Sequence, residues 1–431
     1  MNSSLPQGSV QGVESLLFFT LLQISLIILA ARLAGHLARR LRQPRAVGEI
    51  VAGLMLGPSL FGVLAPDAFH WLFRSVDGTP LTIISQIGLI LLMFQVGLEF
   101  DFSHLEERRN RWAVILITVA GILAPFALGL GFGWVSGPVL AAGIPPVAYS
   151  LFIGIALSIT AVPILGRIMI EFGLTRSRLG VVAIAAAAAN DAVGWVLLAL
   201  VSAVAASRFS WAAMGIQAGM LLAYLLASWF IVRKLLHLLL RRFPHGPDSL
   251  PQDLLALLLV VVFGSAMLTS QFGIFAIFGG FMTGVLLHDR HDLVSAWKNQ
   301  VENLIVVFFL PIFFTYTGLR TDIGSLVSAE LWAWCGLLIL LAVLGKFGGC
   351  YVAARWAGLS AAESRNIAIM MNTRALMELI VVNLGYDMGV IPREVFTMLV
   401  LMAVASTVMA APALRLWLPA AGHRIPEGRD A

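Results

Sequence analysis

The feature that most constrains this chain is a series of long apolar stretches that are separated by short clusters of arginine. A helix needs about 20 mostly apolar residues to cross a bilayer, and thirteen stretches approach or exceed that length. They cover residues 15–38, 46–65, 81–100, 112–136, 146–170, 179–203, 211–236, 253–271, 273–288, 301–319, 330–354, 361–385 and 395–418. Only 12% of the 431 residues are charged, whereas soluble domains carry about 25%. The sequence therefore predicts an all-α polytopic membrane protein and excludes a soluble enzyme, a nucleic-acid binder and a secreted disulfide scaffold.

Basic residues follow the odd-numbered stretches and largely avoid the exits of the even-numbered ones. The odd exits carry Arg39, Arg40, Arg42, Arg45, Arg108, Arg109, Arg111, Arg176, Arg178, Arg233, Lys234, Arg241, Arg242, Arg290, Lys298, Arg355 and Arg365. The even exits carry Arg74, Arg208, Arg320 and Arg393. Because cytoplasmic loops concentrate lysine and arginine, we expect an external N-terminus at 1–14. We also expect a short cytoplasmic tail at 419–431, with no regulatory domain.

The chain carries one short pattern twice, at equivalent places. Residues 97–101 and 318–322 both read Gly-Leu-x-x-Asp, at the ends of the third and tenth stretches. The third stretch is expected to run inward and the tenth outward, so the two copies have opposite topology. We therefore predict two inverted six-helix repeats, 15–203 and 253–418, joined by a linker helix and a cytoplasmic loop over 204–252. Many secondary transporters have this architecture and bind substrate near the midplane on broken helices.

Asp191 is a carboxylate within an apolar stretch, and a charge at the bilayer centre costs about 3 kcal/mol. It follows Asn190 and a run of five alanines, which would let a neighbouring helix approach closely. An acid at such a position indicates a site for a cation or a proton. The alternative is a structural carboxylate that is paired with a buried base.

The stretch before it contains Ser158, Thr160 and Pro163 within six residues. Proline has no N–H and its ring clashes with the carbonyl group four residues earlier, so the helix should kink or unwind here. Freed carbonyl oxygens next to a hydroxyl would suit a hard cation such as Na⁺ or K⁺. An ordinary proline kink packed into the helix bundle is the alternative.

The twelfth stretch contains a second set of polar residues, Asn372, Thr373, Arg374 and Glu378. Arg374 and Glu378 are spaced i, i+4 and could pair along one helix face. No proline or glycine interrupts the centre of this stretch, so its sequence does not predict a break. By the inverted repeat, however, Asn372 and Thr373 should lie opposite the segment from Ser158 to Thr160.

Lys346 is a further charge inside an apolar stretch, flanked by Gly345, Gly348 and Gly349. It could neutralise a buried carboxylate, or lose its own proton and carry it. Residues 288–292 contain histidine and aspartate but also an arginine, and we expect a solvated loop there rather than a metal site. The chain has no zinc-protease, serine-hydrolase or nucleotide-binding motif, so we expect neither an enzyme nor a cofactor.

Several of these segments together resemble the cation:proton antiporter-2 family. Residues 42–50 and 53–58 are similar to the signature of its second helix, while 158–163 and 190–191 are similar to its crossing helix and its ion-binding helix. Residues 371–381 are similar to the Asn-Thr-Lys-Gly-Leu-x-Glu-Leu segment of plant exchangers of the CHX type and of bacterial Kef-like and Nap-like relatives. The resemblance implies the sodium/proton antiporter fold of thirteen helices with broken crossing helices. It also implies a homodimer, a mobile core domain and an elevator-like cycle.

The resemblance assigns ion binding to Asp191 and the basic partner to Lys346. Two departures concern the site: Arg374 and Ala375 replace the Lys-Gly of the plant signature, and Asn190 stands where electrogenic relatives have an acid. We therefore expect K⁺ or Na⁺ and H⁺ to compete for Asp191, with 1:1 electroneutral exchange across the inner membrane of a bacterium. The alternatives are a proton-coupled symporter that binds an organic anion through Arg374, and an ion channel or sensor.

Overall fold

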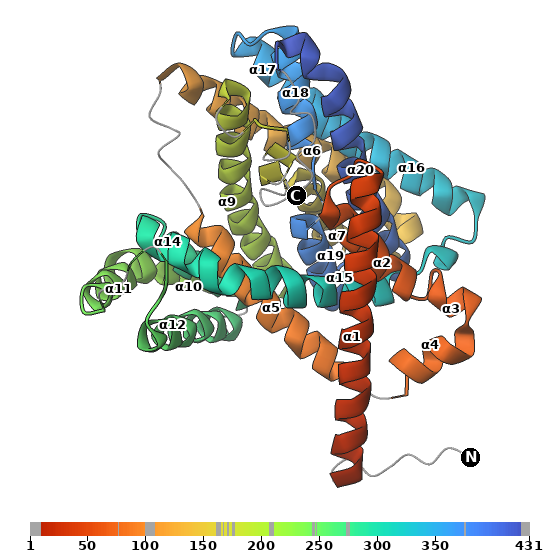
Figure 1. The fold of residues 1–431 in the computed structure, drawn as a ribbon. Coiled ribbons are helices and arrows are strands. Elements are labelled where there is room, and N and C mark those ends of the chain that lie inside the picture. The colour runs from red at the N-terminus through yellow and green to blue at the C-terminus, as the bar shows by residue number, and fades with distance from the viewer. Residues whose placement is uncertain are drawn as a thin grey trace.

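The computed structural model describes residues 10–75, 77–99, 108–160, 165–166, 168–169, 172–174, 177–206, 211–243, 246, 248–272, 276–374 and 376–423. Within these ranges the chain forms helices and turns and contains no strand. The prediction of an all-α fold is therefore confirmed for the described part of the chain (Figure 1).

The first half contains α1 (Val10–Arg40), α2 (Arg45–Leu56), α3 (Phe61–Leu64), α4 (Pro66–Phe73), α5 (Thr79–Leu98), α6 (Arg108–Leu140), α7 (Pro146–Ser158) and α9 (Arg178–Ala206). The linker contains α10 (Trp211–Ala227), η2 (Ser228–Val232) and α11 (Arg233–Leu240). The second half contains α12 (Gln252–Gln271), α13 (Ala276–Val285), α14 (His291–Trp297), η3 (Lys298–Glu302), η4 (Ile305–Phe309), α15 (Leu310–Arg320), η5 (Ile323–Ser325), α16 (Ala329–Val343), η6 (Leu344–Gly348), α17 (Gly349–Trp356), α18 (Ala361–Met371), α19 (Leu376–Asp387), α20 (Arg393–Trp417) and η7 (Pro419–Ala421).

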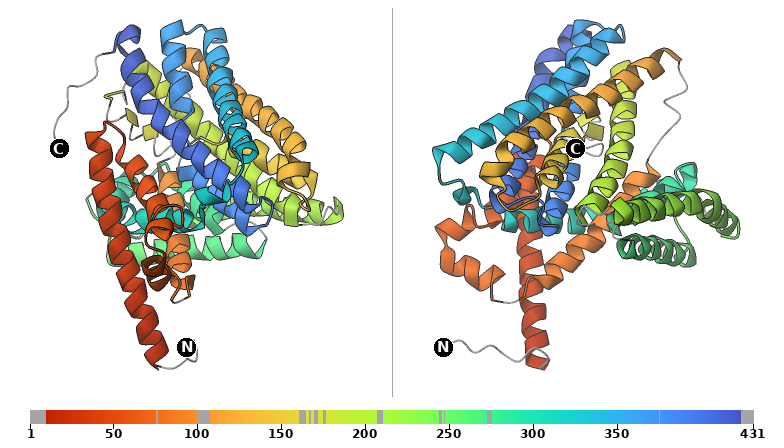
Figure 2. Two further views of the ribbon diagram at one scale, coloured as in Figure 1. Left: turned by 90° about the vertical axis from the view of Figure 1, so that its right-hand side faces the viewer. Right: turned by 180° about the vertical axis from the view of Figure 1, so that it is seen from behind.

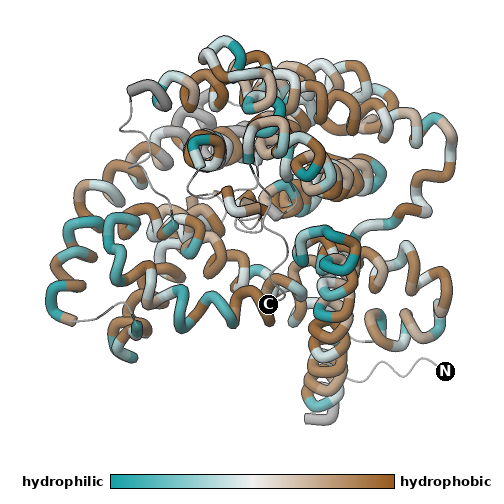
Figure 3. The backbone as a smooth tube through the Cα atoms, turned by 45° about the horizontal axis from the view of Figure 1, so that its top comes forward, coloured by the Kyte–Doolittle hydropathy of each residue, from teal (hydrophilic) through white to brown (hydrophobic). Residues whose placement is uncertain are grey.

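Nine helices in the described ranges are long and apolar enough to cross a membrane, and three shorter apolar helices accompany them. The shorter ones are 146–158, 178–190 and 276–285. The predicted number of thirteen spans therefore stays a prediction. Figure 3 shows hydrophobic colour along the middles of the helices, with hydrophilic colour mainly at helix ends and connections. Large apolar side chains such as Leu33 and Leu37 on α1 are more than half exposed, which suits a surface that faces lipid.

Both predicted crossing segments are broken. α7 ends at Ser158, and Ile159 has an extended backbone. The sequence analysis attributed this break to Pro163, which lies outside the described residues. α18 ends at Met371, and the chain leaves the helical conformation before α19 begins at Leu376. The second break is a finding that the sequence of this stretch did not predict.

The helices pack as two bundles, and each predicted repeat contributes to both. The first bundle contains α1, α2, α5, α12, α13 and α15, and the second contains α6, α7, α9 and α16 to α20. α10 joins the first bundle through Tyr224, which shares a hydrogen bond with Ser265 of α12 and packs on Phe278 of α13. Figures 1 and 2 show α10, α11, α12 and α14 gathered on one side, away from α16, α17 and α18. Contacts between the bundles are fewer and involve mainly α20 with α2 and η5, and α9 with α10.

The two Gly-Leu-x-x-Asp copies have the same packing role. A Cβ atom on Gly318 of α15 would lie 2.0 Å from the carbonyl oxygen of Gly53 on α2, and one on Gly97 of α5 would lie 2.3 Å from that of Phe281 on α13. The second and third helices of one predicted repeat thus pack on the third and second helices of the other. Glycine is required at both places because the backbones touch.

We expect Gly318→Ala to destabilise the protein by about 1–3 kcal/mol, because its methyl group would overlap the α2 backbone. Gly336→Ala in α16 is the matched control, since a Cβ atom there meets nothing within 4 Å. Thermal unfolding of the purified protein in detergent should show a lower midpoint for Gly318→Ala alone. Equal midpoints for the two variants would contradict the packing described for α2 and α15.

Candidate functional site

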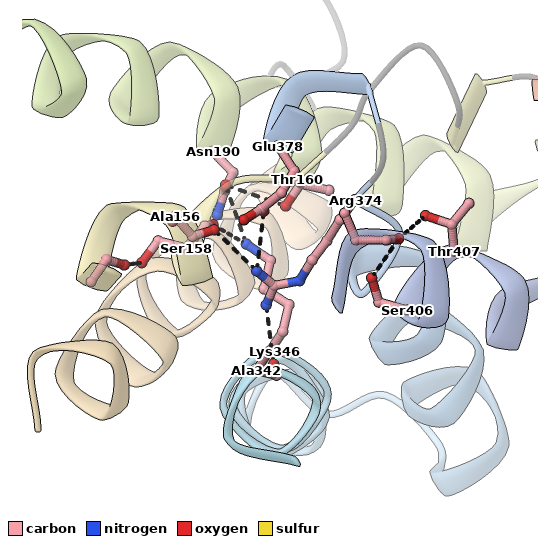
Figure 4. A network of polar contacts seen from close by, with 12 residues as sticks. Ala156, Ser158, Thr160, Asn190, Ala342, Lys346, Arg374, Glu378, Ser406 and Thr407 are labelled. Atoms are coloured by element: carbon pink, nitrogen blue, oxygen red, sulfur yellow. Dashed lines mark hydrogen bonds and ion pairs between the residues drawn. The ribbon is translucent and has the colours of Figure 1, made fainter. Parts of the chain in front are cut away.

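Four parts of the second bundle meet at its centre: the end of α7, the middle of α9, the π-helical turn η6, and the break between α18 and α19 (Figure 4). Lys346, Arg374 and Glu378 lie here with no exposed surface. Asn190, Thr160 and Asn372 are also completely buried. The structure therefore brings together polar residues that are separated by up to 218 positions in sequence.

Three oxygen atoms of described residues accept hydrogen bonds from Lys346. Its ammonium donates to the carbonyl oxygen of Gly121 at 2.8 Å, to that of Ser158, and to the side-chain amide of Asn190. Gly345 beside it packs against the backbone of Pro125 on α6, where a Cβ atom would lie 2.7 Å from the proline Cα. This close approach lets a lysine on η6 reach across to α6 and α7.

The orientation of Asn190 follows from its neighbours, because an ammonium only donates and a carbonyl only accepts. With Oδ1 toward Lys346 Nζ at 3.2 Å, the amide nitrogen donates to the carbonyl oxygen of Ser158 at 3.0 Å and to Thr160 Oγ1 at 3.3 Å. Asn190 therefore connects α9 to the end of α7 and to η6.

Ser158 contributes its backbone rather than its hydroxyl group. The hydroxyl donates to the carbonyl oxygens of Gly154 at 2.7 Å and Ile122 at 3.1 Å, so it serves the local packing of α7. The last carbonyl groups of a helix have no partner within the helix. The Ser158 carbonyl, at the end of α7, is one of these and is satisfied by Lys346 and Asn190.

Arg374 lies in the break before α19 and satisfies a second free carbonyl of α7. Its Nη1 donates to the carbonyl oxygen of Ala156 at 3.2 Å and contacts Glu378 Oε2 at 3.4 Å, while its Nη2 donates to that of Ala342 at 3.1 Å. Arg374 and Glu378 thus form an ion pair, but not along one continuous helix. The cation lies near the C-terminus of α7 and the acid in the first turn of α19, where the helix dipoles favour these charges.

Thr373 and Asn372 form the break itself. Thr373 Oγ1 donates to the carbonyl oxygen of Met370 at 2.7 Å, which satisfies one of the last carbonyl groups of α18. Both polar atoms of the Asn372 side chain are buried and have no hydrogen-bond partner among the described residues. Asn372 thus lies in the predicted crossing segment, but no hydrogen bond of its side chain to a described residue indicates a role.

The backbone of Asp191 lies in α9, one residue after Asn190; its side chain lies outside the described part of the structure. Among the described side chains with no exposed surface, the charges are two cations, Lys346 and Arg374, and one acid, Glu378.

Three partners of these residues were not predicted from the sequence: the carbonyl groups of Gly121, Ala156 and Ala342. Every residue has a backbone carbonyl group, so the residue types at 156 and 342 could not indicate that these two carbonyl groups contact Arg374. Gly121 had one signal, because it is a glycine in the middle of α6. A Cβ atom there would lie 3.0 Å from Cys350 Sγ and 3.5 Å from the side-chain amide group of Asn190.

Comparisons with known proteins agree over most of the chain. The model of a family described as "Sodium/hydrogen exchanger, transmembrane" matches residues 25–418. The Na⁺/H⁺ antiporter NhaS4 of Synechocystis sp. is 38% identical, over 94% of this chain and 99% of its own length. Cation/H⁺ antiporter 17 of Arabidopsis thaliana is 34% identical over 94% of this chain, which spans about half of that longer relative.

A similar fold is found among solved structures. The sodium proton antiporter MjNhaP1 from Methanocaldococcus jannaschii superimposes with a TM-score of 0.63, over 95% of this chain and 99% of that one. The sequence identity is 16%, so this likeness concerns the fold. It confirms the predicted sodium/proton antiporter fold, while the division of the chain into two inverted repeats stays a prediction.

Proposed function

The chain belongs to the sodium/hydrogen exchanger family, and from this premise we propose that it exchanges K⁺ or Na⁺ for H⁺ by secondary active antiport. The observation that most supports a specific site for this exchange is the buried polar group around Lys346 and Asn190, where α7 ends. A cation loses its water at such a depth, and carbonyl groups at a helix end, together with an acid, can supply oxygen ligands in its place.

We assign the exchange to Asp191, which would bind one cation when ionised and one proton when neutral. Thr160 and Asn190 are proposed as neutral partners of the cation. Lys346, Arg374 and Glu378 are proposed as supporting charges that hold the two half-helices in place. Asn372 and Thr373, with Pro163, are proposed as the residues that shape the crossing segments.

Electroneutral exchange follows from the charges in this proposal. With Lys346, Arg374, Glu378 and an ionised Asp191, the empty site has no net charge. Adding either one monovalent cation or one proton gives the same net charge of plus one. The proposal assigns the exchanged proton to Asp191 and a supporting role to Lys346, whose ammonium donates to oxygens of Gly121, Ser158 and Asn190.

The remaining features of the proposal concern the setting of the protein. The chain belongs to a transporter family, and we propose that it catalyses no covalent reaction. We place it in the inner membrane of a bacterium with the N-terminus outside, because arginine concentrates at the opposite loops. A homodimer stays an expectation from the resemblance to antiporters.

The alternative function, a proton-coupled symporter of an organic anion, requires Arg374 to bind the anion. Two carbonyl oxygens and Glu378 already occupy the two terminal nitrogens of this guanidinium group. Its geometry therefore favours a structural role over substrate binding. A channel would need polar residues along its length, whereas the buried charges described here gather at one depth.

The test is proton movement in proteoliposomes that contain a pH-sensitive dye. After a pH gradient is imposed, adding K⁺, Na⁺ or Li⁺ should dissipate it with saturable kinetics, and the same traces give the cation preference. No response to any cation between pH 6 and 9 would contradict antiport, and a flux that does not saturate would indicate a channel.

Electroneutrality has its own prediction. A membrane potential set by a gradient of a lipophilic ion, with no K⁺ present, should leave the initial rate of Na⁺/H⁺ exchange unchanged, because one charge moves in each direction. A rate that increases with the potential would instead indicate two protons per cation, with Lys346 as the second proton carrier. Lys346→Gln should then abolish that dependence.

A further inference from the structure

A hollow at the end of the linker helix is lined by basic and aromatic side chains. It lies between α11 and the connection from α13 to α14, and its volume is about 390 Å³. Pockets that hold small molecules in proteins have volumes of about 300–1,000 Å³. The side chains that line it are Trp229, Phe230, Arg233, Lys234, His237 and Asp289. We call it the linker hollow.

Contacts with Asp289 position two of the lining side chains. Asp289 Oδ2 lies 3.1 Å from Arg233 Nη2 and 3.1 Å from His237 Nε2. His237 Nδ1 lies 2.8 Å from the carbonyl oxygen of Arg233. The Arg233 guanidinium group also lies 4.6 Å from the ring centroid of Trp229. The lining is therefore a connected set of contacts and not a chance group of surface side chains.

The charge of the linker hollow favours an anion. Arg233 and Lys234 contribute two positive charges, and Asp289 contributes one negative charge. Lys234 is exposed and forms no ion pair with a described residue, so its charge is available to a ligand. A second hollow shares Asp289, but its two arginines are balanced by two aspartates. Of these two hollows, the linker hollow is thus the one with excess positive charge.

An exposed apolar stripe leads along the helix to Lys234. Leu222, Leu226 and Phe230 are spaced by four residues and are large exposed apolar side chains. They belong to one of the helices that are long and apolar enough to cross a membrane. Trp229, which is 40% exposed, lies beside the stripe, and tryptophan is enriched where a membrane meets water. The stripe therefore suits lipid chains, and the hollow lies where a headgroup would be.

We propose that the linker hollow binds the headgroup of an anionic phospholipid of the bilayer. The lipid phosphate contacts Lys234 and Arg233, and the acyl chains lie along the apolar stripe. Basic pockets between membrane helices are known to hold such headgroups. A soluble anion would use the same cations but would leave the stripe uncovered. Because Asp289 positions Arg233, the bound lipid also joins the linker helix to the connection from α13 to α14.

Native mass spectrometry of the purified protein in detergent measures this binding directly. The protein is titrated with a phosphatidylglycerol and, separately, with a phosphatidylcholine that has the same acyl chains. The phosphatidylglycerol should bind at lower concentration, because the two lipids differ in headgroup charge. A tenfold excess of inorganic phosphate over phosphatidylglycerol should not displace it, because free phosphate makes no contact with the stripe.

Lys234→Gln should weaken phosphatidylglycerol binding about fivefold, the contribution of one basic residue near a membrane surface. It should leave phosphatidylcholine binding unchanged. Lys234→Arg keeps the charge and should keep the affinity. Arg40→Gln is the matched control, because Arg40 is an exposed arginine at the end of α1 that follows exposed leucines but does not line the hollow. It should bind phosphatidylglycerol as the natural protein does.

Equal affinity for the two phospholipids would overturn the proposal, and so would an equal loss in Lys234→Gln and Arg40→Gln. Weak binding in both Lys234→Gln and Lys234→Arg would contradict recognition through charge. Displacement by inorganic phosphate would assign the hollow to a soluble anion instead. The same spectra count the chains in each particle. If Lys234→Gln lost a second copy of the chain without a change in lipid affinity, this face would be an interface between copies and not a lipid site.

Discussion

Asp191→Asn should reduce cation-driven proton movement in proteoliposomes to the level of protein-free vesicles. The substitution keeps the shape of the side chain and removes its charge and its proton site. An uncompensated charge at the bilayer centre costs about 3 kcal/mol, so cation affinity should fall by about 100-fold. Binding can be measured separately, by the shift in the thermal unfolding midpoint that each cation produces in detergent. That shift should be present in the natural protein and absent in the variant.

The control is Asp292→Asn, because Asp292 is an exposed acid near the start of α14. It should keep both exchange and the cation-dependent midpoint shift. If Asp191→Asn exchanged ions as fast as the natural protein, the site would have to move to another buried acid. Glu378 is the candidate in the same buried group, and Glu378→Gln would then be the next variant to measure.

The lengths of the apolar stretches predicted most of the helices. They did not predict where a helix breaks inside a stretch. A stretch such as 112–136 is continuous in sequence and lies within one long helix, α6. The stretch 146–170 has similar hydrophobicity but α7 ends at Ser158, so each part is shorter than a full span. Counting apolar residues does not distinguish these two cases, because hydrophobicity reports burial in lipid or protein and not the continuity of a helix.

The break at 372–374 shows why local sequence was insufficient. It contains no proline or glycine, but Asn and Thr are weak helix formers, and Thr373 bonds back to the carbonyl group of Met370. Such side-chain bonds to the backbone compete with helix formation. Arg374 then finds partners on α7 and α16, which are distant in sequence and stabilise the non-helical conformation.

The candidate site was partly predictable for a physical reason. Polar side chains in apolar stretches are costly, so Asn190, Lys346 and Arg374 stood out as residues that need partners. The structure places all three in one buried group, although two of the expected contacts differ: Ser158 acts through its carbonyl group, and Arg374 pairs with Glu378 across a break. Which groups these side chains contact depends on which helix ends meet in the folded protein, and the local sequence does not give that.

Arg374→Ala should be among the most destabilising single substitutions in this chain. Arg374 has no exposed surface and contacts Glu378 and the carbonyl groups of Ala156 and Ala342. Removing it leaves a buried carboxylate and two buried oxygens without their partner, and breaking a buried ion pair in this way costs about 3–5 kcal/mol. The thermal unfolding midpoint in detergent should fall sharply. The unfolding midpoint of Arg374→Lys should lie between those of the natural protein and Arg374→Ala. Its ammonium group keeps the charge but lacks the two terminal nitrogens that reach both carbonyl groups.

A double-mutant cycle separates the ion pair from the carbonyl bonds. Arg374→Met with Glu378→Gln removes both charges, so it should be more stable than Arg374→Met alone. With Glu378→Gln as the fourth protein of the cycle, the coupling energy should be about 1–3 kcal/mol. The part of the loss that Glu378→Gln does not recover measures what Arg374 contributes by joining α7 and α16. If the double variant were as unstable as Arg374→Met, the ion pair would carry little of the stability, and the bonds to Ala156 and Ala342 would be the reason that an arginine occupies this break.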